Sequence, residues 1–222
     1  MRSMEEFVSF VTEEAAPPSA PGEDEHPALA LANSAVALPG GHMADLLGTP
    51  AQAEQWLTRR DLAPADAGLA EVCATQLRSL REQVRSLLAS RIAGQPALPA
   101  AVTAINDAMT RVPTASLLLW DEKAGPCRAT PHPTTAIVEH ALAVIAADAA
   151  DLLTAADAAR LTACASPPCN RFLLKRGRRQ WCSTRCGDRA RAARAYARRT
   201  ATTDDATSPT QQVTVHRPAP DA

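Results

Sequence analysis

Aromatic residues are scarce in this chain of 222 residues: they make up 3% of the sequence, as three Trp, three Phe and one Tyr. Lysine is scarcer still, because only Lys123 and Lys175 accompany 21 Arg among the 23 basic residues. A chain with much Ala and few aromatics must fill its core with Ala, Leu and Val, which suits packed helices better than a β-sandwich. The composition therefore predicts a mainly α fold.

Other features are missing altogether. No run is long and apolar enough to span a membrane, and an N-terminus with Glu5, Glu6, Glu13 and Glu14 lacks the basic start of a secretory signal. No nucleophile motif, phosphate loop or paired carboxylate site stands out. We therefore expect no membrane partner, a cytoplasmic location and a non-enzymatic role. Cytoplasmic thiols stay reduced, so six Cys indicate metal binding or catalysis before disulfides.

Charge is distributed unevenly, although the formal net charge is only -1. Residues 1–159 hold 10 basic and 20 acidic residues, whereas residues 160–199 hold 12 basic residues and one acid, Asp188. The second segment therefore carries a formal charge of +11. A GC-rich codon supply would explain Arg in place of Lys, but it would not explain this clustering. Such asymmetry favours a polyanionic partner for the basic segment.

Composition and periodicity divide the chain into four segments. We expect a disordered N-terminal tail over residues 1–27, a helical domain over 28–159, a small module over 160–199 and a disordered C-terminal tail over 200–222. The small module has too few apolar residues to fold without additional stabilisation, such as a bound metal ion. Loss of that metal ion is expected to unfold the module and to leave the helical domain folded.

The helical domain contains several recognisable elements. Thr49 is expected to cap a helix that has Pro50 at its first position and Gln52 closing a capping box. Apolar residues at three- and four-residue intervals predict helices over 66–92 and 134–153. Gly94 and Pro96 are expected to end the first of these, and Arg81 falls outside its apolar stripe. A shorter helix is expected to turn Val102, Ile105, Met109 and Val112 inward. A short β-hairpin is expected over residues 116–130.

Four cysteines in the small module have the spacing of a metal site. Cys164 and Cys169 form one pair, Cys182 and Cys186 form the other, and twelve residues separate the two pairs. Two close pairs of thiolates on tight turns suit tetrahedral zinc. We therefore predict one Zn²⁺, with Phe172 and Trp181 as the small core of the finger. A thiol redox switch or a chance arrangement are the alternatives.

The other candidate ligands form no pattern. Cys73 lies on the apolar stripe of the helix predicted over 66–92 and is expected to be a core residue, and Cys127 has no partner nearby in the sequence. The five histidines are interpreted as structural or surface residues; they are His26, His42, His132, His140 and His216.

A basic, Ala-rich helix is expected to follow Cys186. At 100° per residue, Cys186, Ala190, Ala193 and Ala197 lie on one stripe, which we expect to face the finger or the helical domain. Rows of Arg flank that stripe, in a form suited to phosphate contacts. A solvated helix face and an acidic protein partner are the alternatives. The expected nucleic-acid contacts are Arg178, Arg179, Arg185, Arg189, Arg191, Arg194, Arg198 and Arg199.

The cysteine module resembles the CGNR zinc finger of bacterial regulators. The resemblance rests on the two cysteine pairs, Phe172, the Arg-Arg before Trp181-Cys182-Ser183, and the run from Cys186 to Arg189. Asp188 stands where the family has its name-giving Asn. The upstream region resembles the ABATE domain that accompanies this finger. There the matching residues are Leu31-Ala-Asn33-Ser34, the run from Asp45 to Pro50, and Trp56-Leu57.

This resemblance implies a stress-induced transcription regulator. The fold expected overall is a helical domain with a short hairpin, followed by a treble-clef-like finger ending in a basic helix. The function hypothesis is a DNA-binding regulator whose finger contacts duplex DNA and whose helical domain senses an unknown small ligand or protein partner. The alternative is a zinc-stabilised adaptor that binds an acidic protein surface. The hypothesis of RNA binding has less support, because few aromatic residues are available to stack on bases.

Overall fold

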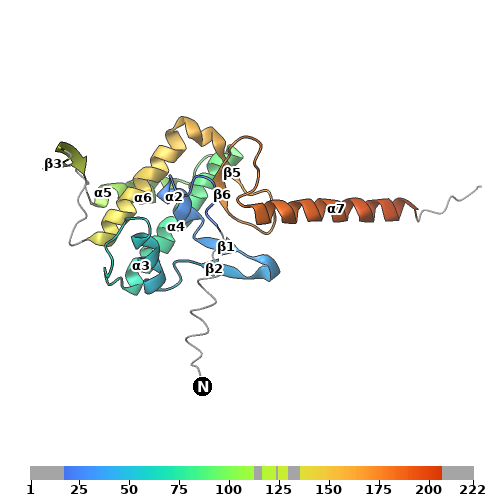
Figure 1. The fold of residues 1–222 in the computed structure, drawn as a ribbon, viewed down its shortest axis with the longest axis horizontal. Helices are drawn as coiled ribbons and strands as arrows, with labels where there is room; N and C mark the ends of the chain where they lie inside the picture. Colours follow the sequence, from blue (N-terminus) through green and yellow to red (C-terminus); the bar gives the residue numbers. More distant parts are fainter. Residues whose placement is uncertain (1–17, 113–116, 124, 130–135, 207–222) are drawn as a thin grey trace, which may run out of the picture.

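Helices dominate the computed structural model, which describes residues 18–112, 117–123, 125–129 and 136–206 (Figure 1). The helices of the body are α2 (Pro27–Ala32), α3 (Pro50–Thr58), α4 (Glu71–Ala93), α5 (Pro99–Arg111) and α6 (Ile137–Thr154). Two short 3-10 helices are η1 (Pro39–Gly41) and η2 (Ala156–Arg160). The last helix is α7 (Thr184–Ala206). These elements confirm the expected mainly α fold.

The strands of the described residues form three antiparallel pairs. The first joins β1 (Ala35–Ala37) to β2 (Met43–Asp45), the second joins β3 (Leu117–Asp121) to β4 (Gly125–Ala129), and the third joins β5 (Leu161–Ala163) to β6 (Phe172–Leu174). In the third pair, Leu161 lies opposite Leu174 and Ala163 opposite Phe172. The third pair carries the first two cysteines of the finger in its connecting loop.

The short helix α2 lies at the centre of the body and contacts both α4 and α6. Every residue from Ala28 to Ala32 is buried. Small alanine side chains allow helices to approach closely, so a core with few aromatics can still be well packed. Asp148 of α6 anchors the start of α2, because its Oδ2 accepts from the Ala28 N–H at 2.8 Å and its Oδ1 bonds His26 Nδ1 at 2.8 Å.

Helix boundaries follow the expected capping signals with one exception. Thr49 caps α3 with both bonds of the capping box, as predicted. Gly94, at φ 64°, ends α4, also as predicted. Helix α4 begins at Glu71 and not near residue 66, because Asp66 has a left-handed backbone (φ 61°) that no α-helix can include.

A partly buried charge pair lies between α4 and β2. Arg81 is 6% exposed, although it was expected outside the apolar stripe of its helix. Its Nη1 and Nη2 donate to Asp45 Oδ1 and Oδ2 at 2.7 and 3.0 Å, and Nη1 also bonds Ser34 Oγ at 3.1 Å. The pair therefore ties the β1–β2 hairpin to the central helix.

The expected inward face of α5 is partly wrong. Ile105 is 4% exposed, as predicted, but Val102 is 42% and Met109 is 36% exposed. Ala101 and Ala108 take their places against the core. The helix packs between α4 and α6, and small residues on that side allow the closer approach.

The predicted hairpin is present as β3 and β4, but it does not belong to the core. Every residue of β3 is exposed, including Leu118 and Trp120 at 72% and 75%. Figure 1 shows the strand pair projecting from the α5–α6 end of the body. Residues 113–116 and 130–135, which connect it to the body, lie outside the described residues.

The finger and the helical body share one core. Leu161, Phe172 and Leu174 of β5 and β6 are buried in the same cluster as the residues of α2, α4 and α6. Residues 18–27, where disorder was expected, also pack here: Ala20, Gly22 and Glu23 are buried, and Leu174 N donates to Pro21 O at 2.8 Å. Residues 1–17 lie outside the described part of the chain.

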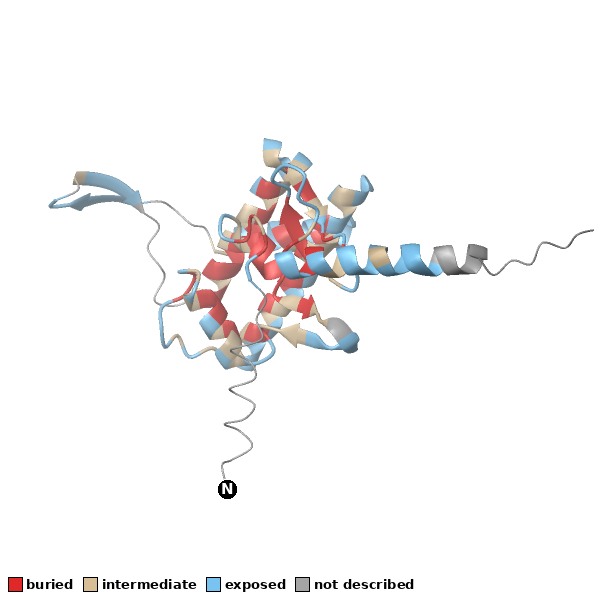
Figure 2. Cartoon of the chain, turned by 45° about the vertical axis from the view of Figure 1, so that its right-hand side comes forward, coloured by how far each residue is buried: buried red, intermediate tan, exposed pale blue. Residues whose placement is uncertain are grey.

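Helix α7 extends away from the body (Figure 1). Figure 2 shows that its surface is exposed along most of its length. It continues to Ala206, into the segment from residue 200 for which disorder was expected; residues 207–222 lie outside the described residues. Within the described residues, no helix is both long enough and apolar enough to cross a membrane.

Candidate metal centre and basic helix

Two local structures bring the four predicted cysteines together. The loop between β5 and β6 carries Cys164 and Cys169; Cys164 N donates to Arg171 O at 2.8 Å, and Cys169 N donates to Ser166 O at 2.9 Å. The second pair lies at the start of α7. There Ser183 Oγ accepts from Cys186 N at 3.2 Å, as an N-cap residue does.

The four sulfurs form one compact group. All four Sγ atoms lie within 4.8 Å of one another. Cys182 Sγ is 3.6 Å from Cys169 Sγ and 3.5 Å from Cys186 Sγ. Four ligands at a Zn–S distance of about 2.3 Å in a tetrahedron would lie about 3.8 Å apart. The cluster thus has the size and donor set of a four-thiolate metal site, and it could hold one metal ion.

Groups around the sulfurs favour negative charge. Arg189 Nη2 lies 3.4 Å from Cys186 Sγ, and Arg171 Nη1 lies 3.9 Å from Cys182 Sγ. The backbone N–H of Cys182 donates to Cys164 Sγ at 3.5 Å. Since four thiolates and a divalent cation together carry -2, these donors offset charge that would otherwise be buried.

The crowding of the sulfurs changes their acidity in opposite directions. Hydrogen bonds from Cys169 and then from Cys182 lower the pKa of the Cys164 thiol. The same contacts raise the pKa of Cys169 and of Cys182, chiefly through the hydrogen bond that each makes to Cys164. A metal ion bound by all four sulfurs would displace the thiol protons that remain.

Arg171 links this cluster to the helical body. It is 3% exposed, and its Nη2 donates to Glu23 Oε1 at 2.7 Å while its Nη1 donates to Pro18 O at 2.9 Å. Glu23 Oε1 also accepts from Asn33 Nδ2 at 2.6 Å. This buried chain of contacts was missed by sequence reasoning, because its members lie up to 153 residues apart.

Family comparison agrees with this architecture. Residues 25–156 match the ABATE family, which is described as "putative stress-induced transcription regulator", and residues 160–199 match the CGNR zinc finger. The chain belongs to the ABATE family. The resemblance drawn from the sequence is therefore confirmed, in the expected domain order. Among curated proteins, no relative matches the chain.

One ABATE motif residue bonds the CGNR segment directly, and its neighbour bonds within the helical body. Asn33 belongs to the motif Leu31 to Ser34. Its Oδ1 accepts from the Phe172 N–H at 2.7 Å, and its Nδ2 donates to the Phe172 carbonyl at 2.8 Å. Ser34 donates to Leu31 O at 2.8 Å and receives a bond from Arg81. In this ABATE protein the motif therefore serves to join its two parts.

The two aromatic residues of the finger have different surroundings. Trp181 packs against the cysteine cluster, as expected. Phe172, however, is buried in the core of the helical body, beneath the guanidinium of Arg85 at 5.1 Å. The expectation that both aromatics form the core of the finger is wrong for Phe172, because β6 turns alternate side chains toward opposite sides; its neighbour Leu173 packs on the cysteines.

The predicted arginine surface is only partly available for a ligand. Arg189 turns inward, donating to Ser166 Oγ and Ser166 O at 3.2 and 3.0 Å as well as to Cys186. Arg179 is exposed but donates to the carbonyls of Trp181 and Cys182. The inward turn of Arg189 has a signal in the sequence, since it lies one helical turn after Cys186. The other six predicted contacts are exposed; they are Arg178, Arg185, Arg191, Arg194, Arg198 and Arg199.

Trp181 organises the base of the helix. The guanidinium carbons of Arg191 and Arg194 lie 5.8 and 5.6 Å from the centre of its ring. Asp188, which replaces the Asn of the family name, bonds Arg191 Nη2 at 2.5 Å. Both arginines remain exposed, so these contacts orient them without removing their charge from solvent.

The expected role of the alanine stripe is wrong beyond its first turn. Cys186 is buried and Ala190 is half-buried, but Ala193 and Ala197 are exposed. Among the described residues the stripe has no packing partner there, because α7 has already left the body (Figure 2). The remaining candidate ligands do not join the cluster: Cys73 lies against the core and Cys127 is exposed on β4.

Proposed function

We propose that this chain is a zinc-dependent transcription regulator that binds duplex DNA through its CGNR finger and α7. The observation that carries the proposal is an exposed, arginine-bearing helix that rises directly from a four-cysteine cluster. The ABATE description as a transcription regulator supports the same function. No catalytic role is assigned to any residue.

Zinc is the proposed metal because of the ligand chemistry. Four thiolates in a tetrahedral arrangement are the donor set of structural zinc sites, which have no open position for a substrate. Such a site contributes to folding and holds the base of α7 rigid. We place the protein in the cytoplasm, where thiols stay reduced and available as ligands.

Helix α7 has dimensions that suit a DNA groove. Its 23 residues extend about 34 Å at 1.5 Å per residue, which is about one turn of duplex DNA. Arg191, Arg194 and Arg198 recur at intervals of three and four residues and thus lie on one face. A row of guanidinium groups on a free helix favours contacts to the phosphate backbone, which dominate DNA affinity.

Charge supports the same partner. The formal +11 of residues 160–199 becomes about +9 when one zinc ion and four thiolates are included. If half of these charges reach phosphates, log affinity should fall with log salt at a slope of roughly -4 to -5. An acidic protein surface would also attract this helix. Its carboxylates, however, would not have the regular spacing of the phosphates along duplex DNA.

The test is a salt titration of the zinc-loaded chain on labelled genomic duplex fragments. Fluorescence anisotropy should give the slope stated above, and the triple variant R194A/R198A/R199A should flatten it by about two to three units. The matched control R91A/R111A removes two exposed arginines of the helical body and should leave the slope unchanged. Both variants should keep their metal content, since none of these residues touches a cysteine.

An opposite result favours the adaptor hypothesis. If no DNA binding remains at about 0.15 M salt, while an acidic protein partner stays bound there, the DNA proposal fails. Equal losses in the triple variant and in the control would also contradict it, because the affinity would then reflect total charge and not α7.

A further inference from the structure

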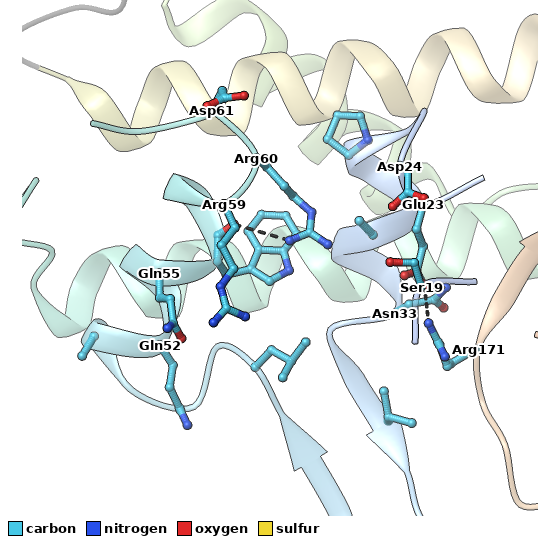
Figure 3. Close-up of a pocket in the computed structure, with 16 residues that line it drawn as sticks. Ser19, Glu23, Asp24, Asn33, Gln52, Gln55, Arg59, Arg60, Asp61 and Arg171 are labelled. Atoms are coloured by element: carbon cyan, nitrogen blue, oxygen red, sulfur yellow. Dashed lines mark hydrogen bonds and ion pairs between the residues drawn. The ribbon is translucent and has the colours of Figure 1, made fainter. Parts of the chain in front are cut away.

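A cavity of about 930 Å³ opens between α3 and the segment that precedes α2. Figure 3 shows Arg59, Arg60, Gln52 and Gln55 on one side, and Glu23, Asn33 and Arg171 across from them. Apolar side chains complete the wall; they are Pro27, Ala30, Val36, Leu46 and Ala51. The volume lies within the range of small-molecule sites, which combine apolar walls with a few polar groups.

Two residues that line this cavity carry a buried donor without a hydrogen-bond partner in the described structure. The donors are Trp56 Nε1 and Arg171 Nε, on side chains that are 4% and 3% exposed. A buried N–H without an acceptor is costly, and native proteins rarely leave one unpaired. Two such donors on residues that line one cavity point to a ligand that supplies acceptor atoms.

Charge near Trp56 is positive. The guanidinium of Arg60 lies over the Trp56 ring at 4.3 Å, and Arg59 lines the same wall. Burial is the main influence on the pKa of Arg60 and lowers it. A partly buried cation of this kind gains from an anionic partner that enters the cavity with it.

The opposite charges of the cavity limit what that anion can be. Glu23 is already bonded by Arg171 and Asn33, whereas Asp24 and Asp61 are exposed at the rim. These carboxylates would repel a ligand with several negative charges. They disfavour a phosphate dianion more than a single carboxylate.

We propose that this cavity binds a small organic monocarboxylate. Its carboxylate accepts from Trp56 Nε1 and pairs with Arg60 and Arg59, and its apolar part lies against Val36 and Leu46. The occupant also meets Arg171, whose Nη1 lies 3.9 Å from Cys182 Sγ. The cavity therefore places a ligand next to the side chain that joins the helical body to the cysteine cluster. Binding here does not depend on whether α7 contacts DNA.

The probe is sodium benzoate, added to the full-length, zinc-loaded chain labelled with ¹⁵N. The indole N–H resonance of Trp56 is identified as the one that disappears in Trp56→Phe. It should shift in a saturable way with a dissociation constant of about 1 mM, a typical value for a ligand of this size. Benzamide has the same shape without the charge and should cause no saturable shift. Phenyl phosphate should bind at least about tenfold more weakly than benzoate.

Variants separate the site from non-specific effects. Arg60→Gln should weaken benzoate binding about tenfold or more, through loss of a charged hydrogen bond, and Arg59→Gln should weaken it less. Arg91→Gln, on an exposed part of α4, is the matched control and should bind as the parent does. Without ligand, Trp56→Phe should not lower the melting temperature, because it removes a donor that has no partner.

Three results would overturn the proposal. One is the absence of any saturable Trp56 shift with benzoate at about 20 mM, far above the expected constant. Another is an equal response to benzamide, which would show that no carboxylate is recognised. Tighter binding of phenyl phosphate than of benzoate would exclude the monocarboxylate class. Each readout is independent of DNA, so a failure here leaves the test of the proposed function unaffected.

Discussion

The side-chain amide of Asn33 forms two hydrogen bonds with the backbone of Phe172, 139 residues further along the chain. Its Nδ2 donates to the Phe172 carbonyl at 2.8 Å, and its Oδ1 accepts from the Phe172 N–H at 2.7 Å. Asn33 thus occupies the place of a further strand beside β6. Through this pair, the end of α2 fixes the position of the finger.

Loss of the Asn33 side chain should destabilise both parts of the protein. Asn33→Ala leaves the buried N–H and C=O of Phe172 without partners, and we expect the free energy of unfolding to fall by about 2–4 kcal/mol. Urea denaturation followed by circular dichroism measures the change. Asn106→Ala, at an exposed site on α5, should change it by less than about 0.5 kcal/mol. A loss below about 1 kcal/mol in Asn33→Ala would mean that the pair does not hold the two parts together.

Metal content should depend on the four clustered cysteines alone. Cys182→Ser is expected to lose the metal, because Cys182 Sγ lies within 3.6 Å of two other sulfurs. Cys73→Ser and Cys127→Ser should retain one metal ion per chain. Elemental analysis of the purified variants checks both statements, and full metal content in Cys182→Ser would show that the ligand assignment is wrong.

Removal of the metal should weaken the helical body as well as the finger. From the sequence, the two were expected to unfold separately. The structure gives a different expectation, because Leu161, Phe172 and Leu174 are part of the shared core. Chelation should therefore lower the temperature at which the helical circular dichroism melts. An unchanged melting temperature would restore the expectation of independent folding.

The Arg81–Asp45 pair should make stability sensitive to acid. Burial alone would raise the pKa of Asp45, but hydrogen bonds from Arg81 and the Leu47 N–H, together with the charges of Arg81 and Arg78, lower it below its usual value. A lowered pKa in the folded state means that the carboxylate stabilises the fold above the pKa of the unfolded chain. That contribution is lost as pH falls through the folded pKa.

Asp45→Asn tests this contribution. At neutral pH it should lower the free energy of unfolding by about 1–3 kcal/mol, because the buried Arg81 loses its paired contacts with Asp45 and keeps only the exposed Glu82 as a charge partner. The difference in the free energy of unfolding between Asp45→Asn and the parent chain should become smaller as the pH falls below about 4. Asp107→Asn, at an exposed site on α5, should show no such convergence. A gap that stays constant with pH would contradict the assigned charge pair.

The projecting hairpin should contribute little to the stability of the body. Leu118 and Trp120 are 72% and 75% exposed, so Leu118→Ser and Trp120→Ser should each change the free energy of unfolding by less than about 0.5 kcal/mol. Urea denaturation of the two variants checks this. A loss of about 2 kcal/mol or more would show that these side chains are buried in solution.

Local signals in the sequence predicted several elements correctly. Thr49, Pro50 and Gln52 are neighbours, so their capping box depends on backbone geometry that a short peptide already contains. Gly94 ends α4 for the same kind of reason. The hairpin of β3 and β4 was also predicted, but its exposure was not, because burial depends on what surrounds a strand.

The sequence by itself determined the helical class, the clustering of positive charge and the two cysteine pairs, because composition, spacing and local capping act over a few residues. Only the tertiary structure decided which charged groups are buried. Arg81 and Arg171 look like the exposed arginines in the sequence, yet each turns inward to a carboxylate. Their partners are supplied by the packing of other elements, and burial of a charge is tolerated only where such a partner is present.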